Sequence, residues 1–142
     1  MDNIKIIRSD KDINWSEVRE LLKIVDMEYR DPEVHKKAFG NSFTKAFIFD
    51  EDGKLIAMGR AISDGAYEAG FYDIAVLPDK QGLGLGRMVV EAMLEDLESI
   101  NVILFSAPGK EGFYSSLGFK KMLTGMARFA KPEIMEEKGF TK

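Results

Sequence analysis

Hydrophobic residues recur with helical spacing in two stretches of the chain, and two shorter stretches also favour helices. In Trp15–Val25 and in residues 85–98, apolar positions return every three or four residues, which predicts two amphipathic helices. A shorter helix is predicted over Pro32–Phe39, because proline is tolerated at the first helical position. Glu111–Leu117 predicts a fourth helix, which Gly118 would end as a left-handed cap.

Alternating or continuous apolar runs predict the strands. These runs are Asn3–Arg8, Thr44–Phe49, Lys54–Ile62, Tyr67–Leu77, Asn101–Ser106, Phe119–Leu123 and Met126–Ala130. The dipeptide Asp52-Gly53 predicts a hairpin, because its residues accept the positive φ angles of a tight turn. The stretch Asn101–Ser106 is apolar nearly throughout, which is typical of a strand buried on both faces.

The order of these elements predicts the fold class. Antiparallel hairpins precede a strand–helix–strand crossover, so we expect an α/β (α+β) fold. Its mixed, largely antiparallel sheet would have six to seven strands and about four flanking helices. A length of 142 residues fits one domain, residues 1–142. Its core is expected over about residues 3–130, followed by a charged and loosely held tail over residues 131–142.

Composition and charge exclude several classes of site. The chain has no cysteine and one histidine, His35, so disulfides, thiolate chemistry and multi-histidine zinc sites are excluded and no metal is expected. We interpret His35 as a surface or helix-packing residue. A net charge of −4 without a basic block argues against nucleic-acid binding. The apolar runs are too short to span a bilayer and the first residues lack a signal-peptide pattern, so we expect a cytoplasmic protein without a membrane partner.

A glycine-rich turn over Gln81–Arg87 (QGLGLGR) joins the strand ending near Leu77 to the long helix. Amides near a helix N-terminus lack intrahelical partners and glycine lets a ligand approach the backbone, so the turn is typical of a diphosphate cradle. A tight turn that needs glycine only for its dihedral angles is the alternative. The segment is not a P-loop, because Arg87 stands where lysine is required, and its glycine spacing does not match a dinucleotide-binding fingerprint.

Two motifs give the turn a more specific interpretation. Gln81-x-x-Gly84-x-Gly86, after the strand end IAVLP, resembles the acetyl-CoA motif of the GNAT superfamily of N-acetyltransferases. Further along, Gly112–Phe119 (GFYSSLGF) resembles the second signature of that family. The predicted element order over residues 3–130 is also similar to the family's fold. The segments Arg60–Gly65 and Gly125-Met126 resemble a subgroup that includes small bacterial members and plant plastid amine acetyltransferases.

The resemblance implies where acetyl-CoA, the expected co-substrate, would bind. The strand ending at Leu77 would splay from Asn101–Ser106 and leave a V-shaped slot for pantetheine. The Ile74 amide would also face the thioester carbonyl and stabilise its oxyanion. The implied cofactor-binding residues are those of the strand end and of the turn: Ile74, Ala75, Val76, Gln81, Gly82, Leu83, Gly84, Leu85, Gly86 and Arg87.

The resemblance also implies the catalytic groups. Tyr114 matches the family's general acid, and a phenol is protonated at neutral pH and can donate to the departing thiolate. For the general base, Asp73 in the reactive strand is the first choice, with its side chain on the face opposite Ile74. Glu68 and Glu111 are alternatives. Asp73 could instead bind substrate or have a structural role, with water carrying the proton.

The predicted function is therefore direct transfer of an acetyl group from acetyl-CoA onto a primary amine, in a ternary complex. The alternatives are a non-catalytic CoA-binding module of the same fold, or an acyltransferase that uses another acyl-CoA or a protein N-terminus. A small amine is the expected acceptor partner, bound between the first two helices and the ends of the hairpin strands. A homodimer is compatible with exposed sheet edges.

Overall fold

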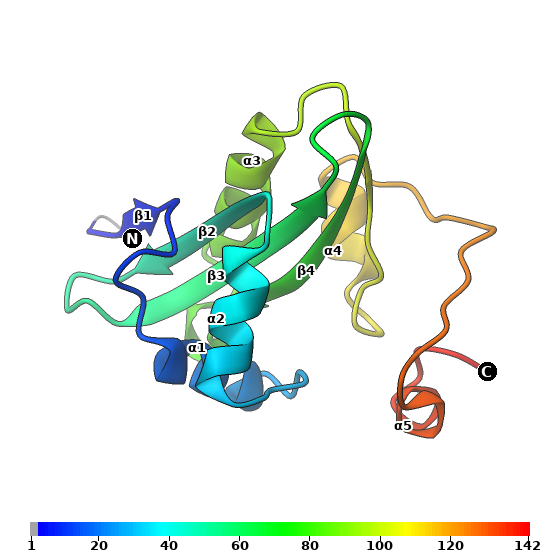
Figure 1. Cartoon of the computed structure of the whole chain (residues 1–142), viewed down its shortest axis with the longest axis horizontal. Helices are drawn as coiled ribbons and strands as arrows, with labels where there is room; N and C mark the ends of the chain where they lie inside the picture. Colours follow the sequence, from blue (N-terminus) through cyan, green and yellow to red (C-terminus); the bar gives the residue numbers. More distant parts are fainter. Residues whose placement is uncertain (1–2) are drawn as a thin grey trace. The chain divides into compact units, whose positions relative to one another are not determined.

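A computed structural model describes residues 3–142, which divide into two compact units (Figure 1). The first unit ends at Leu104 and the second spans Phe105–Lys142. The elements of the first unit are β1 (Lys5–Ile7), α1 (Trp15–Ile24), α2 (Pro32–Gly40), β2 (Thr44–Phe49), β3 (Leu55–Ser63), β4 (Glu68–Val76), the single-turn 3-10 helix η1 (Pro78–Lys80), α3 (Leu85–Glu95) and β5 (Asn101–Ile103). The helices of the second unit are α4 (Glu111–Ser116) and α5 (Pro132–Glu137).

The sheet confirms the predicted fold class. Its strand order is β1-β2-β3-β4-β5, with antiparallel pairing up to β4 and parallel pairing between β4 and β5. The parallel pair is joined through α3, as a strand–helix–strand crossover requires. Residues 3–142 form five strands, fewer than the six or seven expected from the sequence.

The predicted hairpin between β2 and β3 forms as the turn residues require. Asp50 and Lys54 are joined by a backbone hydrogen bond of 2.9 Å, and Gly53 has a φ of +79°. The Asp50 side chain also accepts hydrogen bonds from the amides of Asp52 and Lys54, both at 2.9 Å. The Asp50 carboxylate stabilises the turn by accepting the amides within it, and a defined turn fixes the register of the two strands.

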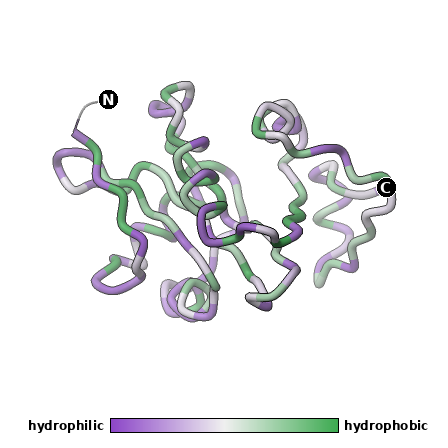
Figure 2. Tube along the Cα trace, turned by 90° about the horizontal axis from the view of Figure 1, so that it is seen from above, coloured by the Kyte–Doolittle hydropathy of each residue, from purple (hydrophilic) through white to green (hydrophobic). Residues whose placement is uncertain are grey.

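Helices cover both faces of the sheet in the first unit (Figure 1). A Cβ on Gly59 of β3 would meet Val89 and Met93 of α3, whereas the guanidinium of the next residue, Arg60, lies over the ring of Phe39 in α2. Consecutive strand residues point to opposite faces, so α3 and α2 lie on opposite sides of the sheet. Hydrophobic residues accordingly concentrate along the strands, and hydrophilic residues in the turns (Figure 2).

The close approach of α3 to β3 depends on Gly59. A Cβ there would lie 2.7 Å from Cγ1 of Val89 and 3.0 Å from Cγ1 of Ile74. We expect Gly59→Ala to destabilise the protein by about 1–3 kcal/mol, the usual cost of overpacking a core. Urea unfolding measures the change. Gly112→Ala is the control, because nothing lies within 4 Å of its Cβ position; an equal loss in both variants would contradict the account.

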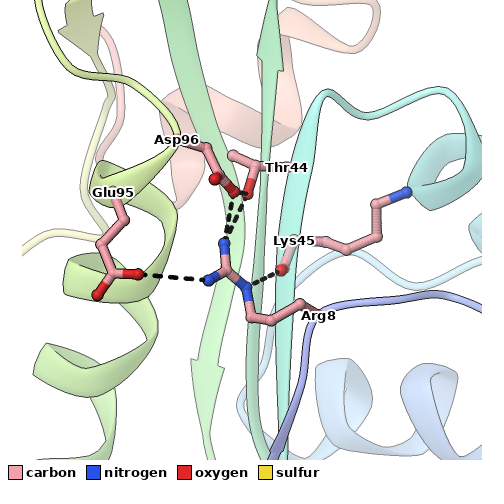
Figure 3. Close-up of polar contacts among 5 residues, drawn as sticks. All are labelled: Arg8, Thr44, Lys45, Glu95 and Asp96. Carbon is pink, nitrogen blue, oxygen red and sulfur yellow. Dashed lines mark hydrogen bonds and ion pairs between the residues drawn. The ribbon is translucent and has the colours of Figure 1, made fainter.

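Arg8 ties the first strand to the end of α3 (Figure 3). Its Nε donates to the Lys45 carbonyl at 2.9 Å, and its Nη2 donates to Thr44 Oγ1 at 3.0 Å and to Asp96 Oδ2 at 2.7 Å. Glu95 completes the group, with 4.0 Å between its Oε2 and Nη1 of Arg8. The cluster joins the short β1 and β2 to the helix that follows the glycine-rich turn.

Three strand predictions for the last third of the chain are wrong, one in its extent and two in their existence. The apolar run at Asn101 forms an edge strand of three residues, and Ile103 is 50% exposed, so the strand is not buried on both faces. Phe119–Leu123 and Met126–Ala130 form no strands, since an apolar pattern makes a strand only where a partner supplies hydrogen bonds. Within residues 131–142, Pro132–Glu137 forms α5 and the ring of Phe140 packs 5.6 Å from that of Phe105.

Candidate functional site

A bulge interrupts β4 at Asp73. The β3–β4 register pairs Met58 with Ala75 and Arg60 with Tyr72, so two residues of β4 lie opposite one residue of β3. Asp73 has a φ of +57°, in the left-handed region that non-glycine residues seldom adopt. A single extra residue with this geometry is a β-bulge, which bends a strand and re-aims the groups after it.

The bulge decides which way the backbone of β4 faces. Before the bulge, the Glu68 carbonyl accepts a hydrogen bond from the Asp64 amide at 3.2 Å. The backbone N–H and C=O groups of even-numbered residues therefore point toward β3. After the bulge, the Leu77 amide donates to the Ile56 carbonyl at 2.9 Å, so the backbone groups of odd-numbered residues point toward β3. The alternation is therefore reversed, and the backbone groups of Ile74 point to the other edge of β4.

On that other edge, β5 accompanies only the beginning of β4. In the part of the chain that the structure describes, the β4–β5 ladder ends where Gly70 meets Ile103. Ile74 and Val76 lie beyond that end, and the Val76 carbonyl accepts a hydrogen bond from Gln81 Nε2 at 3.1 Å. An edge with backbone donors and acceptors directed outward can bind an extended ligand as an added strand.

The Asp73 side chain lies on the opposite face from Ile74, as the sequence predicted, and is held by Arg60. Arg60 Nε donates to Asp73 Oδ2 at 2.7 Å, and the two side chains are 15% and 20% exposed. The guanidinium carbon lies 5.4 Å from the ring centre of Tyr72 and 5.7 Å from that of Phe39. One carboxylate oxygen of Asp73 is thus engaged in a partly buried ion pair.

His35 is a buried helix-packing residue, in line with its interpretation from the sequence. Its Nε2 accepts the backbone amide of Arg30 at 2.9 Å, which requires the neutral imidazole with its proton on Nδ1. Burial is the main cause that lowers the pKa of His35 below its ordinary value. The charges of Arg60, Arg30 and Arg19 act in the same direction, and that of Asp73 opposes them. The contact holds the loop between α1 and α2.

This environment predicts a pH dependence of stability. Because the folded state lowers the pKa of His35, the unfolded chain binds more protons between that lowered pKa and the ordinary value of 6.5. The stabilisation is complete above pH 6.5 and is lost as the pH falls toward the folded-state pKa. Urea unfolding of the wild type and of His35→Gln over pH 5 to 8 isolates this contribution as their difference. A difference that does not change with pH would contradict it.

The glycine-rich turn is open to solvent. Gly82 and Gly84 have φ angles of +81° and +84°, and nothing lies within 4 Å of either Cβ position. Gly84 is the N-cap of α3 and has no side-chain cap. The first i→i−4 bond of the helix joins the Met88 amide to the Gly84 carbonyl at 3.1 Å, so the amides of Leu85 and Gly86 precede it. This geometry fits an anionic group such as a diphosphate.

The other residues of the turn support it in different ways. Leu85 is only 2% exposed and anchors the start of α3 in the core, whereas Leu83 is 52% exposed. The Gln81 side chain links the turn to the end of β4, because its Nε2 donates to the Val76 carbonyl. Arg87 lies on the exposed side of the helix, with its Nη1 3.4 Å from Glu91 Oε1. Arg87 therefore contributes a cation to the surface near the cradle.

Tyr114 lies in α4 of the second unit, half-buried between two aromatic rings. Its ring centre is 4.9 Å from that of Phe113 and 5.9 Å from that of Phe119. Burial raises the pKa of Tyr114 above its ordinary value. The phenol is therefore protonated throughout the neutral range, as a proton donor must be.

The two alternative carboxylates are engaged locally. Glu68 Oε1 accepts from Asn101 Nδ2 at 3.0 Å, and Glu111 Oε1 and Oε2 each accept the Gly109 amide at 3.2 Å. In the second hairpin, Asp64 Oδ1 accepts the amides of residues 66, 67 and 68, and these bonds lower the pKa of its carboxyl. Residues 64–67, between β3 and β4, therefore form the hairpin turn.

The described residues form neither a metal-binding cluster nor a membrane-spanning helix. Among residues 3–142, no group of three or more histidine, cysteine, aspartate or glutamate side chains comes together where it could hold a metal ion. Within the same range, none of the helices is both long and apolar enough to cross a membrane.

Sequence reasoning assigned no role to Arg60 and did not predict the bulge. Aspartate is enriched among the non-glycine residues that adopt a positive φ, but Asp73 alone is a weak signal because aspartate is also common in other conformations. Gly59 is the other available sign, since an isolated glycine within a predicted strand suggests a bulge or a close backbone approach.

Comparisons with known proteins place this geometry in a family. The model of the acetyltransferase (GNAT) domain matches residues 42–121. An uncharacterized N-acetyltransferase ycf52 of Pyropia yezoensis is 34% identical over 121 residues, which are 81% of this chain and 70% of that protein. A relative of the same name from Gracilaria tenuistipitata var. liui is 37% identical, and the chain spans 62% of its length.

A plant relative and a solved structure agree with this. Serotonin N-acetyltransferase 2, chloroplastic, of Oryza sativa subsp. japonica is 43% identical over 70 residues, or 47% of this chain and 35% of that protein. A probable acetyltransferase of meticillin-resistant Staphylococcus aureus has a TM-score of 0.79 at 25% identity, covering 89% of this chain and 98% of its own. This chain is therefore an N-acetyltransferase and belongs to the GNAT family.

Proposed function

We propose that the chain transfers an acetyl group from acetyl-CoA directly to a primary amine. The observation that carries the proposal is the combination of an outward-facing strand edge at Ile74–Val76 with an open cradle at the adjoining helix N-terminus. A carrier with an amide-containing arm and a diphosphate is complementary to both features.

The residues of the cradle and of the strand edge would hold the donor. Gly82, Gly84 and the first amides of α3 bind the diphosphate, because their backbone groups are open and the helix dipole favours negative charge there. Ile74 and Val76 pair with the pantetheine arm, and Gln81 must release the Val76 carbonyl for that pairing. Acetyl-CoA supplies the activated acyl group, and the Ile74 amide stabilises the negative charge that forms on its carbonyl oxygen.

Tyr114 and Asp73 would move the protons. The amine must lose a proton to attack the carbonyl carbon, and Asp73 receives it through Oδ1, the carboxylate oxygen not bound to Arg60 Nε. Tyr114 donates its phenolic proton to the sulfur as the carbon–sulfur bond breaks, a role supported by its raised pKa. The nitrogen loses its second proton as the tetrahedral intermediate collapses, and that proton restores the phenol of Tyr114. The products are the acetylated amine, free CoA and the proton taken up by Asp73.

The acceptor would lie on the Asp73 face of the sheet. Tyr72 and Ile62 expose 38% and 50% of their surface there, and Tyr29 exposes 42% after α1. Tyr72 and Ile62 offer apolar contacts on the face of the sheet that carries the Asp73 carboxylate, which suits a small amine with an apolar body. Arylalkylamines are the first class to test, because one relative is named for serotonin.

A thiol-release assay tests the proposal. The protein is incubated with acetyl-CoA and, in turn, arylalkylamines, polyamines, amino acids and N-terminal peptides, and the products are identified by mass. We expect release of CoA that depends on an amine, with a product heavier by one acetyl group. Release that occurs only with propionyl- or succinyl-CoA would overturn the choice of donor, and acetylation of peptides alone would overturn the small-amine acceptor.

A further inference from the structure

Arg60 is the side chain that holds the bulge of β4. Its Nε donates to Asp73 Oδ2 at 2.7 Å, and the two side chains are 15% and 20% exposed. The interaction of a shielded ion pair is screened less by solvent than that of an exposed one. The contact is therefore suited to hold the backbone of Asp73 in one conformation.

The guanidinium has a fixed position of its own. The rings of Tyr72 and Phe39 lie 5.4 and 5.7 Å from its carbon, and its Nη1 is 3.4 Å from Ser42 Oγ. These neighbours come from β4, from α2 and from the turn before β2. Because several elements position the Arg60 head group, it does not simply follow Asp73 if the bulge relaxes.

The bulge needs such support. A left-handed conformation costs a non-glycine residue roughly 1–2 kcal/mol, and Asp73 adopts it at a φ of +57° within a strand. On the other face, Ile74 Cγ1 lies 3.0 Å from the Cβ position of Gly59, so packing there limits how Ile74 can move. The ion pair with Arg60 supports the strained residue from the Asp73 face.

We propose that Arg60 is a positioning residue for acetyl transfer, acting through Asp73 to keep the Ile74 amide directed to the open edge of β4. The inference rests on the proposed function, in which that amide meets the thioester carbonyl. Without the ion pair, β4 can return to regular alternation, where even-numbered residues face β3. The Ile74 amide would then turn away from the ligand.

Two variants test this positioning role. Arg60→Met keeps an apolar stem over the neighbouring rings but removes the charge and the donor, whereas Arg60→Lys keeps a cation. We expect Arg60→Met to lower kcat by about 10–100-fold, the scale of a displaced catalytic group. The Kd for CoA should rise by much less than kcat falls, because the diphosphate cradle is separate from the bulge and only the pantetheine contact at Ile74 is disturbed. Arg60→Lys should recover part of the loss.

A spectroscopic measurement separates positioning from a merely structural role. In the wild type, the Ile74 amide resonance should differ between the CoA and acetyl-CoA complexes, because only the latter offers a carbonyl to that amide. Arg60→Met should abolish the difference. Wild-type kcat in Arg60→Met, or a retained resonance difference, would overturn the inference, as would equal impairment of the methionine and lysine variants.

Failure of the proposed function would be visible in the wild type alone, as absence of acetyl-CoA turnover or of any Ile74 resonance difference. Failure of the Arg60 inference appears only on comparing variants. Should Arg60→Met not fold, Arg60→Lys supports the same comparison with a smaller expected loss.

Discussion

Tyr114→Phe is expected to lower kcat by about 10²–10³-fold, because it removes the acid that protonates the departing thiolate. Phenylalanine keeps the ring that packs against Phe113 and Phe119. The fold and the Kd for CoA should therefore change little. Steady-state kinetics with a saturating amine measure kcat, and calorimetric titration measures the affinity for CoA.

The pH profile gives the same prediction a second test. Burial raises the pKa of Tyr114 above its ordinary value of about 10, so the acid remains protonated throughout the neutral range. The alkaline fall in kcat should lie above that value in the wild type and disappear in Tyr114→Phe. Tyr67→Phe is the matched control, since Tyr67 is 65% exposed in the hairpin before β4. Equal turnover in Tyr114→Phe and Tyr67→Phe would remove the tyrosine from the mechanism.

Gly84→Asp is expected to weaken CoA binding by roughly 100-fold or slightly more. Two unit charges about 5 Å apart repel by about 3 kcal/mol at an effective dielectric constant near 20, and each 1.4 kcal/mol is tenfold in affinity. Space does not oppose the substitution, because nothing lies within 4 Å of the Cβ position. Aspartate also tolerates the left-handed φ better than most residues do.

Stability should not follow affinity in this variant. A carboxylate at the N-terminus of α3 interacts favourably with the helix dipole, so the melting temperature of the free protein should be at least that of Gly84→Asn. Asparagine has the same shape without the charge, so Gly84→Asn should weaken CoA binding only a few-fold. Calorimetry on both variants decides the matter. Equal affinities would show that no diphosphate lies near Gly84.

The elements that were predicted well from the sequence are those determined by residues close together along the chain. The hairpin between β2 and β3 follows from a strand pattern interrupted by Asp52-Gly53, and α3 follows from apolar residues at helical spacing. The open glycine-rich turn was predictable for the same reason, because glycines between a strand and a helix act through their own dihedral angles. None of these features needs knowledge of a distant partner.

The elements that were not predicted from the sequence depend on partners that lie far away along the chain. The run from Asn101 could not reveal that β5 pairs on one side only, and Phe119–Leu123 could not reveal that it pairs with no strand in the described residues. The bulge at Asp73 depends on Arg60, thirteen positions earlier, and on the packing of Gly59 against α3. The backbone direction at the candidate site is thus a property of the assembled sheet.

A crystal structure of the complex with CoA tests the central claim most directly. The account predicts the diphosphate against the amides at Gly82–Gly86 and the pantetheine arm along Ile74–Val76, with the Gln81 side chain released from the Val76 carbonyl. A diphosphate bound elsewhere, with the Gln81 contact intact and the edge of β4 uncovered, would contradict it.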